Sequence, residues 1–218
     1  MDHRKLAELL FPDVDKTPED YEKAFPARDL PEGALVTRLA PSPTGYIHLG
    51  NLYGAMVDER LAHQSGGVCY LRIEDTDEKR EVEGAVPVLL DVLSYFGINF
   101  DEGACKAGTP DSEPVPSEEG AAQRGDYGPY WQSNRGAIYK ACVKYLVEQG
   151  KAYPCFMSEE EIAQLRAEQE ARKENPGVYG KYAKYRDASI EEVKAHLDKG
   201  EIPVMRFRSE GDPSKYLK

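Results

Sequence analysis

A short proline-rich stretch holds the residues of this chain that are best suited to chemistry. Residues 38–51 read RLAPSPTGYIHLGN and place His48 two residues before Gly50 and three before Asn51. If a helix begins here, His48 and Asn51 share one face. A helix N-terminus offers free N–H groups and the positive end of the helix dipole, and a glycine lets a ligand approach the backbone. The stretch is a candidate polyphosphate site, although a solvated histidine in a strand-to-helix turn fits the same spacing.

Apolar periodicity predicts the elements that would position this stretch. Residues 34–40 are a short apolar run ended by a proline, typical of a buried strand. A helix is expected from residue 48 to a Gly-Gly stop, with strands at 68–73 and 98–100 and a helix at 82–96. The expected inward face of the first helix is Leu49, Leu52, Tyr53, Met56, Val57 and Leu61. This order indicates an α/β fold with a Rossmann-like parallel sheet, whose ligands bind at the carboxyl ends of strands.

Composition divides the chain into further segments. Residues 1–33 read as an N-terminal extension of short helical turns, and residues 34–137 contain the predicted sheet. Within the latter, residues 103–126 are rich in proline and acidic residues, which predicts a mobile acidic loop. Residues 138–218 contain two serine-led capping boxes and two short apolar runs, so they are expected to form a separate, smaller α+β domain.

Charge and composition exclude some classes of protein. The formal net charge of −11 argues against a generally basic nucleic-acid-binding surface, but not against a local positive patch. There is no apolar run long enough to span a bilayer and no secretory signal, so a cytoplasmic location without membrane contact is expected. The cysteines form no Cys-x-x-Cys pair and are expected to be reduced and packed. They are Cys69, Cys105, Cys142 and Cys155.

Several motifs together resemble one family. Residues 38–51 resemble the first signature of class I aminoacyl-tRNA synthetases and, within that class, the glutamyl-tRNA synthetase family. Other motifs agree in order: LRIEDTD at 71–77, FDEG at 100–103, YGPYWQS at 127–133 and GKAY at 150–153. The resemblance implies the N-terminal half of the class I catalytic domain, with an inserted domain at 138–218 that binds the acceptor end of tRNA.

The resemblance also implies the reaction. Glutamate attacks the α-phosphate of ATP, with Mg²⁺, to give glutamyl-adenylate and pyrophosphate. The glutamyl group then passes to the 3′ end of tRNA. The family generally needs bound tRNA for the first step. ATP and Mg²⁺ are thus the expected cofactors, and L-glutamate and tRNA the expected partners.

By the same resemblance, the turn at 38–51 contacts ATP. His48, Gly50 and Asn51 are the expected catalytic residues, and Ala40 and Ser42 complete the ATP-binding set. Attack on a phosphoryl group needs positioning and charge stabilisation more than covalent help, which suits a histidine and free amides at a helix start.

Glutamate is expected to bind beside ATP. Arg38 would grip its side-chain carboxylate, because a guanidinium can pair with a carboxylate bidentately. Glu74 would hold the α-ammonium, and Ala40 and Ser42 would also contact the amino acid. The structural alternative is a plain Arg38–Glu74 salt bridge at a strand end.

Other motif residues are assigned structural roles. Asp75 and Asp77 are expected first to cap or orient neighbours and only then to contact tRNA. The aromatic residues at 127–131 are expected to pack, with stacking on RNA as the alternative.

Two departures from the family pattern change the expected contacts. Asn51 stands where the family usually has glycine, threonine or histidine, so it is expected to be a weaker ATP contact. Some relatives bind zinc through a Cys-x-Cys pair and later ligands. Here that pair reads Cys155-Phe-Met157, and residues 179–186 contain no cysteine. One thiol cannot complete a four-ligand site, so neither zinc nor another structural metal is expected.

The length is the larger departure. The family continues into a second half with a KMSKS-like loop and then an anticodon-binding region, for which residues 213–218 are no convincing substitute. The chain is therefore expected to be a fragment with little or no aminoacylation activity of its own. The alternatives are a glutamyl-Q tRNA(Asp) synthetase-like enzyme that modifies a tRNA base, a small nucleotidyltransferase, and a non-catalytic tRNA-binding module. Oligomeric state and charging of a glutamine tRNA stay open.

Overall fold

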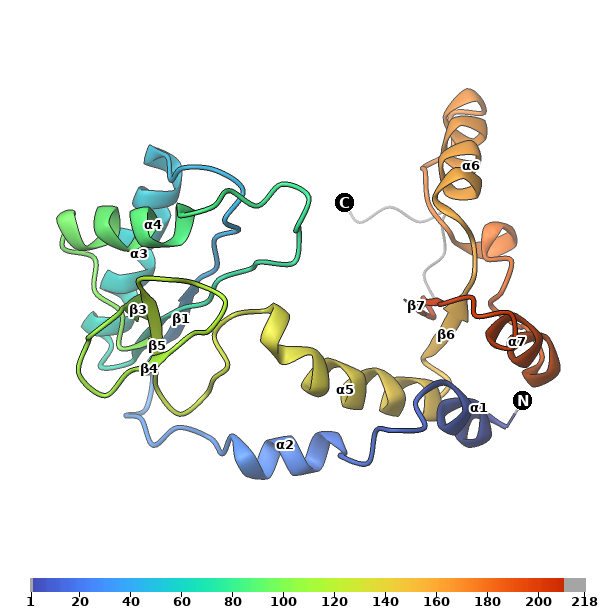
Figure 1. Cartoon of the computed structure of the whole chain (residues 1–218), viewed down its shortest axis with the longest axis horizontal. Coiled ribbons are helices and arrows are strands. Elements are labelled where there is room, and N and C mark those ends of the chain that lie inside the picture. Colours follow the sequence, from blue (N-terminus) through green and yellow to red (C-terminus); the bar gives the residue numbers. More distant parts are fainter. Residues whose placement is uncertain (1, 210–218) are drawn as a thin grey trace. The chain divides into compact units, whose positions relative to one another are not determined.

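The chain folds into two compact units. The computed structural model describes residues 2–209. One unit runs from Glu19 to Ala137, and the other combines the first 18 residues with the chain from Ile138 onward. The extension expected at 1–33 is therefore divided between the two units, because the helix that opens the chain packs into the core of the second one. Each unit is described by itself below (Figure 1).

The unit at 19–137 is built on one mixed sheet. Its strands lie in the order β1-β2-β3-β5-β4, with β1, β2 and β3 parallel and the β5 and β4 pairings antiparallel. The elements are α2 (Pro18–Ala24), β1 (Val36–Leu39), α3 (Leu49–Gln64), β2 (Val68–Leu71), α4 (Ala85–Tyr95), β3 (Glu102–Lys106), β4 (Glu113–Pro114), β5 (Ala121–Arg124) and the 3₁₀ turn η1 (Ser133–Arg135). The strand-helix-strand order confirms the predicted α/β, Rossmann-like fold.

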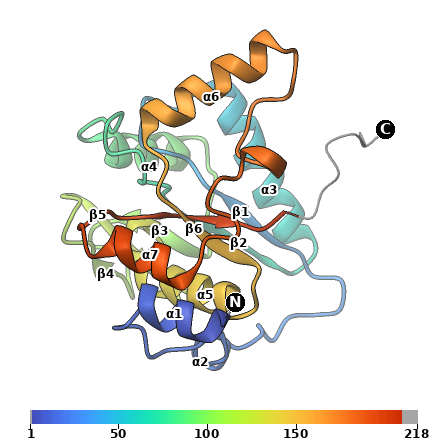
Figure 2. The same cartoon turned by 90° about the vertical axis from the view of Figure 1, so that its right-hand side faces the viewer.

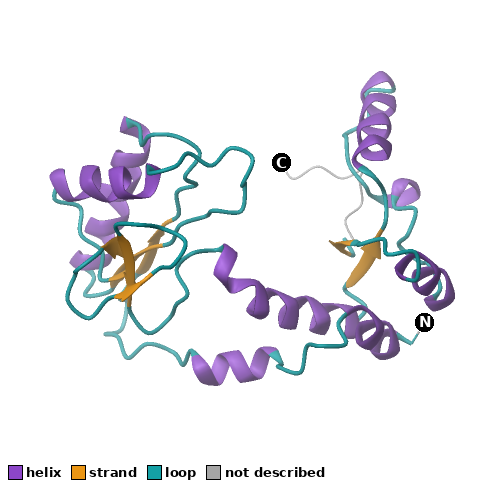
Figure 3. Ribbon diagram, in the orientation of Figure 1, coloured by secondary structure: helices purple, strands orange, loops and turns teal. Residues whose placement is uncertain are grey.

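Two predictions about the edge of this sheet were wrong. The third parallel strand is β3, not residues 98–100, and the segment 103–126 contains most of β3 together with β4 and β5 rather than only loop (Figure 3). Ile98 is buried in the core from a loop, so its apolar character does not mark a strand. β3 reads Glu-Gly-Ala-Cys-Lys and has no run of β-branched residues, so pairing with β2 and β5 decides its conformation.

Helix α3 has the predicted start but buries a different face. Leu49, the first residue of the expected inward face, is 80% exposed, and Tyr53 is 66% exposed. The buried positions are Ala55, Glu59 and Ala62, and of the expected face Leu52 is partly buried against the core that contains Ala55. Small side chains on this face let the helix backbone approach the sheet closely, which large apolar side chains would prevent.

The buried carboxylate of Glu59 is held by a histidine. His63 Nδ1 lies 3.1 Å from Glu59 Oε1, and His63 Nε2 lies 3.0 Å from Asp101 Oδ2. Asp101 Oδ2 also accepts a hydrogen bond from the Cys69 backbone N–H at 2.8 Å. The exposed Arg60 contacts the other carboxylate oxygen of Glu59, with Nε 3.4 Å from Oε2. The imidazole thus bridges α3 to the loop before β3.

This bridge predicts a pH-dependent stability. The hydrogen bond to Asp101, opposed by desolvation, raises the pKa of His63 above its usual value. A histidine whose pKa is raised in the folded state contributes stability that is fully present below its unfolded-state pKa of about 6.5. This contribution is lost as the pH rises through the folded-state pKa. The loss in unfolding free energy caused by His63→Gln is therefore expected to be larger at pH 6 than at pH 8, measured by urea denaturation. An equal loss at both pH values would contradict the bridge, and Arg60→Gln is the control.

The second unit is a helical module around a two-stranded antiparallel sheet. Its elements are α1 (His3–Leu10), α5 (Gly136–Glu148, whose first two residues belong to the other unit), β6 (Ala152–Cys155), α6 (Glu159–Ala171), the 3₁₀ turn η2 (Gly180–Tyr182), α7 (Ile190–Leu197) and β7 (Val204–Phe207). Helices α1, α5 and α7 lie near one another (Figure 2), and they contribute Leu6, Val147 and Val193 to one core.

Local signals located several of these elements correctly. The Ser158 side chain accepts from the Glu161 backbone N–H, and the Glu161 carboxylate accepts from the Ser158 backbone N–H, which is the predicted capping box of α6. Ser189 accepts from the Glu192 N–H at the start of α7. Both predicted strands of this unit are present as β6 and β7.

The cysteines of the described chain are free thiols, as expected, and Cys69 and Cys155 are buried. Burial raises the pKa of the Cys69 thiol to about 11. None of the helices within residues 2–209 is long and apolar enough to cross a membrane.

Candidate active site

The backbone after β2 continues between two neighbouring segments. The Arg72 N–H donates to Leu39 O at 3.0 Å, and the Glu74 N–H donates to Pro41 O at 2.9 Å. On the other side, the Ile73 N–H donates to Tyr130 O, and the Ile73 carbonyl oxygen accepts from the Gln132 N–H, both at 2.9 Å. Residues 72–74 are thereby fixed at the carboxyl ends of the first two strands, where open α/β sheets bind ligands.

Strand alternation gathers charged side chains on one face of this edge. Leu71 and Ile73 are fully buried on the core face, so Arg72 and Glu74 point to the opposite face. Arg38 pairs in register with Tyr70, which places the Arg38 side chain on that opposite face as well. Arg72 Nη2 lies 2.6 Å from Glu74 Oε1, and Arg38 Nη1 lies 3.5 Å from the same oxygen. The site edge therefore holds two guanidinium groups and one carboxylate.

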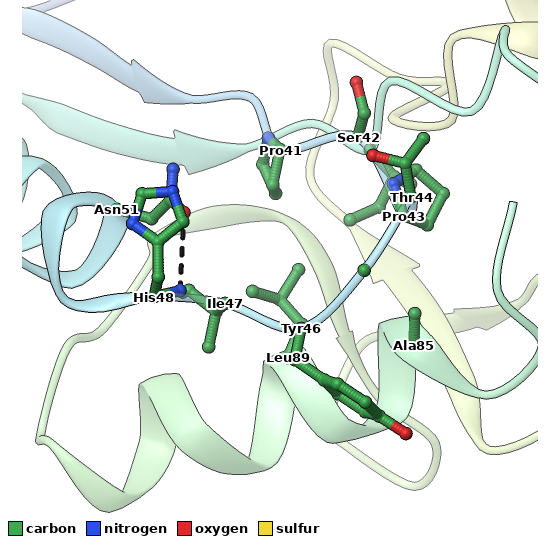
Figure 4. Close-up of a pocket in the computed structure, with 12 residues that line it drawn as sticks. Pro41, Ser42, Pro43, Thr44, Tyr46, Ile47, His48, Asn51, Ala85 and Leu89 are labelled. Carbon is green, nitrogen blue, oxygen red and sulfur yellow. Dashed lines mark hydrogen bonds between the residues drawn. The ribbon is translucent and has the colours of Figure 1, made fainter. Parts of the chain in front are cut away.

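The proline-rich turn encloses a pocket of about 360 Å³. Its polar lining comes from Ser42, Thr44, His48 and Asn51. Its apolar lining includes Ile47 and Ile73, with Ala85 and Leu89 from α4 (Figure 4). His48 is thus among the residues that line this pocket.

Helix α3 begins directly at the predicted residues. His48 is its N-cap, and Asn51 Oδ1 accepts from the His48 backbone N–H at a long 3.5 Å (Figure 4). Because the side-chain oxygen of Asn51 faces this backbone group, its amide N–H groups remain available for a ligand. A Cβ added to Gly50 would lie 3.1 Å from His48 Cε1, so the missing side chain makes room for the imidazole ring.

Asp75 and Asp77 bond to other residues of the chain, which is the first of the two roles expected for them. Asp75 Oδ1 accepts from the Ser133 N–H at 2.9 Å, and Asp75 Oδ2 accepts from the Ser133 hydroxyl at 2.5 Å. Asp77 pairs with Arg80, and this pairing lowers the pKa of the Asp77 carboxyl. Trp131 is 1% exposed, which confirms packing for the centre of the aromatic motif.

A second group of contacts holds Tyr130, the residue whose carbonyl bonds to Ile73 next to the site. These contacts were not predicted from the sequence. Arg28 Nη2 lies 2.5 Å from Glu102 Oε2, and Arg28 Cζ lies 3.6 Å from the centroid of the Tyr127 ring. The Tyr130 hydroxyl donates to Glu102 at 2.7 Å, and the Tyr130 carbonyl holds Ile73. These residues lie far apart in the sequence, so no local pattern pointed to them. Arg72 could have been predicted from the sequence. It lies in the predicted strand at 68–73, two residues before Glu74, and residues two apart in a strand point to the same face.

The structure brings the predicted residues together in two groups. Ser42, His48 and Asn51 line the pocket, whereas Arg38 and Glu74 meet on the sheet face. Ala40 and Gly50 belong to the same turn and helix start but do not line the pocket. Within residues 2–209, no cluster of three or more His, Cys, Asp or Glu side chains is placed to hold a metal ion.

Parallel strands with a His-Leu-Gly-Asn helix start after the first, and with the 71–77 motif at the end of the second, are the arrangement that the motif resemblance implies for a class I aminoacyl-tRNA synthetase catalytic domain. The chain belongs to the family described as tRNA synthetases class I (E and Q), catalytic domain, whose model matches residues 34–216.

Two curated relatives within this class are named glutamate–tRNA ligase. The chain is 54% identical to the glutamate–tRNA ligase of Acetivibrio thermocellus and 50% identical to that of Clostridium perfringens strain 13, each over 99% of this chain and 37% of the relative. It thus spans little more than a third of the length of these curated relatives. The crystal structure of glutamate–tRNA synthetase from Elizabethkingia anophelis matches with a TM-score of 0.64 and 33% identity, over 80% of this chain and 33% of that one. A glutamate tRNA ligase from Elizabethkingia meningosepticum, in complex with its amino acid, matches with a TM-score of 0.63 and 34% identity, over 80% of this chain and 32% of that one.

Proposed function

We propose that this chain is the ATP- and glutamate-binding part of a glutamate–tRNA ligase. The observation that carries the proposal is the placement of Arg38 and Glu74, whose charged groups lie 3.5 Å apart at the carboxyl end of the sheet. A positive and a negative group side by side are matched to the side-chain carboxylate and the α-ammonium of glutamate. The names of the relatives support the same substrate. A cytoplasmic location goes with this proposal.

The residues of this chain would act by positioning and by charge stabilisation. Arg38 orients glutamate through its side-chain carboxylate, and Glu74 through its ammonium, so that the α-carboxylate faces the α-phosphate of ATP. His48 and the free N–H groups at the start of α3 stabilise the negative charge that grows on the phosphates. Ser42 and Asn51 complete the nucleotide contacts from the same turn. Mg²⁺, bound with ATP, supplies further charge neutralisation.

The unit at 138–218 is proposed to bind the acceptor end of tRNA. This role rests on the family resemblance of the motifs at 127–133 and 150–153 and on the length of the family match, which extends to residue 216. Zinc is not expected here, since Cys155 is the only thiol near the relevant motif.

Pyrophosphate exchange tests the proposal. The full-length protein is incubated with ATP, tRNA and either glutamate, glutamine or aspartate, and exchange is expected only with glutamate and only with tRNA present. Exchange with another amino acid, or none at all, would overturn the proposal. A tRNA with an oxidised 3′ ribose separates the acceptors, because glutamyl transfer to it would indicate a modified base. The isolated 218-residue chain is expected to give little exchange, since it spans 37% of the relatives' length.

Gly50 gives a prediction with a matched control on the same helix. Alanine is favoured over glycine in helices by about 1 kcal/mol, so Gly50→Ala and Gly54→Ala are both expected to leave stability unchanged or raised. Only the Gly50→Ala methyl group meets the His48 ring, at 3.1 Å, whereas a Cβ at Gly54 meets nothing within 4 Å. We expect Gly50→Ala to raise the KM for ATP by roughly tenfold, with Gly54→Ala unchanged. An equal KM in both variants would contradict a nucleotide role for His48.

A further inference from the structure

Two arginines contact the carboxylate of Glu74, and one of these contacts is stronger than the other. Both contact the same oxygen, Oε1, with Arg72 at 2.6 Å and Arg38 at 3.5 Å. The Arg72 side chain is 19% exposed and that of Arg38 is 40% exposed. Short, sheltered charge-assisted bonds persist, whereas long, exposed ion pairs contribute little. The Arg38 contact is therefore the one that can be exchanged for a ligand.

The second carboxylate oxygen of Glu74 is available. Within the part of the chain that the structure describes, Glu74 Oε2 has no hydrogen-bond or ion-pair partner. The main chain at this point is fixed on both sides, through Arg72 N to Leu39 O and Glu74 N to Pro41 O. The backbone of Glu74 is thus fixed, and the Arg72 side chain holds one oxygen of its carboxylate. The other oxygen, Oε2, is thereby kept in one position, where a ligand can contact it.

We propose that Arg72 is a positioning residue, which keeps Glu74 oriented toward the α-ammonium of glutamate when the substrate takes Arg38. The charges of Arg38 and Glu74 partly neutralise each other in this structure. An incoming glutamate replaces this contact with two new ones, its side-chain carboxylate on Arg38 and its ammonium on Glu74. Without Arg72, Glu74 would lose its last fixed partner at that step and would rotate among its side-chain conformers. This inference rests on the proposed function.

Loss of Arg72 is expected to affect the two substrates of the first step, glutamate and ATP, differently. Arg72 contacts Glu74, and it does not line the pocket that holds Ser42, His48 and Asn51. A loss of Arg72 should therefore weaken the amino acid and spare the nucleotide. A purely structural role for Arg72, in which it only stabilises the sheet edge, would affect both substrates together, because residues 72–74 and the pocket share this edge.

The test is Arg72→Met in the full-length protein, followed by pyrophosphate exchange with tRNA present. Methionine keeps an unbranched apolar side chain and removes the guanidinium group with its charge. The KM for glutamate is expected to rise roughly 10- to 100-fold, the effect of losing one charge-assisted bond. The KM for ATP is expected to stay within about twofold. Arg72→Lys, which keeps the charge and can make one bond to Oε1, should recover most of the affinity. Thermal unfolding of each variant confirms that it is folded.

Three results would overturn the inference. They are an unchanged KM for glutamate, an equal rise in the KM values for glutamate and ATP in both Arg72 variants, and an undiminished effect of Arg72→Met when Glu74→Gln is already present. The last follows because residues that act through one another are not additive. If the unmodified protein fails to activate glutamate, the proposed function itself has failed. If it activates glutamate normally while Arg72→Met changes nothing, only the positioning role has failed.

Discussion

Replacing Arg38 by alanine is expected to lower kcat/KM for glutamate in pyrophosphate exchange by about 100-fold or more. This corresponds to roughly 3 kcal/mol, the upper range for a hydrogen bond between charged groups. The reason is the position of the Arg38 guanidinium, 3.5 Å from Glu74 on the open face of the sheet, where it is 40% exposed and free to meet a substrate carboxylate. Removing it also leaves the site edge with less positive charge opposite Glu74.

Arg60→Ala is the matched control for this variant. Arg60 is another arginine of the same unit, but its side chain is 66% exposed on α3 and pairs with Glu59, away from the strand ends. Its exchange activity is expected to stay within about twofold, because the exposed Arg60 side chain contacts Glu59 and none of the predicted site residues. If Arg38→Ala behaves like Arg60→Ala, then Arg38 and Glu74 form only a strand-end salt bridge, and the glutamate site lies elsewhere.

Replacing Gly103 by alanine is expected to destabilise the unit at 19–137 by about 3 kcal/mol or more. Gly103 has a φ of +110°, and a Cβ there would lie 2.1 Å from the carbonyl oxygen of Leu71, its partner in β2. The substitution combines the strain of a positive φ, about 1–2 kcal/mol, with overpacking against a backbone that cannot move without opening the β2–β3 pairing. That pairing positions the end of β2, from which Arg72 and Glu74 follow.

Comparison with Gly108→Ala separates the steric part of the Gly103→Ala effect from the backbone strain. Gly108 also has a positive φ, +82°, but a Cβ there would meet nothing within 4 Å. Its replacement is expected to cost only the backbone strain of about 1–2 kcal/mol. Urea denaturation followed by tryptophan fluorescence is the measurement, because Trp131 is the single tryptophan of the chain and is buried in this unit. Equal losses for the two variants would show that the close approach of β2 and β3 is not what Gly103 permits.

The local parts of the fold were predictable because they depend on neighbours in the sequence. The prolines after β1, the histidine that begins α3 and the serines that cap α6 and α7 act within a few residues, through restricted backbone angles and short hydrogen bonds. The inward face of α3 was not predictable in this way. Tyr53 and Met56 have the spacing of a buried face, yet Ala55 and Ala62 occupy it, because the distance between helix and sheet favours small side chains.

The sequence alone indicated the family and the start of the helix at His48, and it singled out Arg38 and Glu74 through two separate motifs. The tertiary structure decided that β3 follows residue 101, that Arg28 reaches Glu102 behind the site, and that Arg72 and Arg38 converge on a single carboxylate oxygen. Strand pairing and ion pairing join residues that are distant in the chain. Their geometry exists only after the sheet has assembled, so no local pattern of residues could specify it.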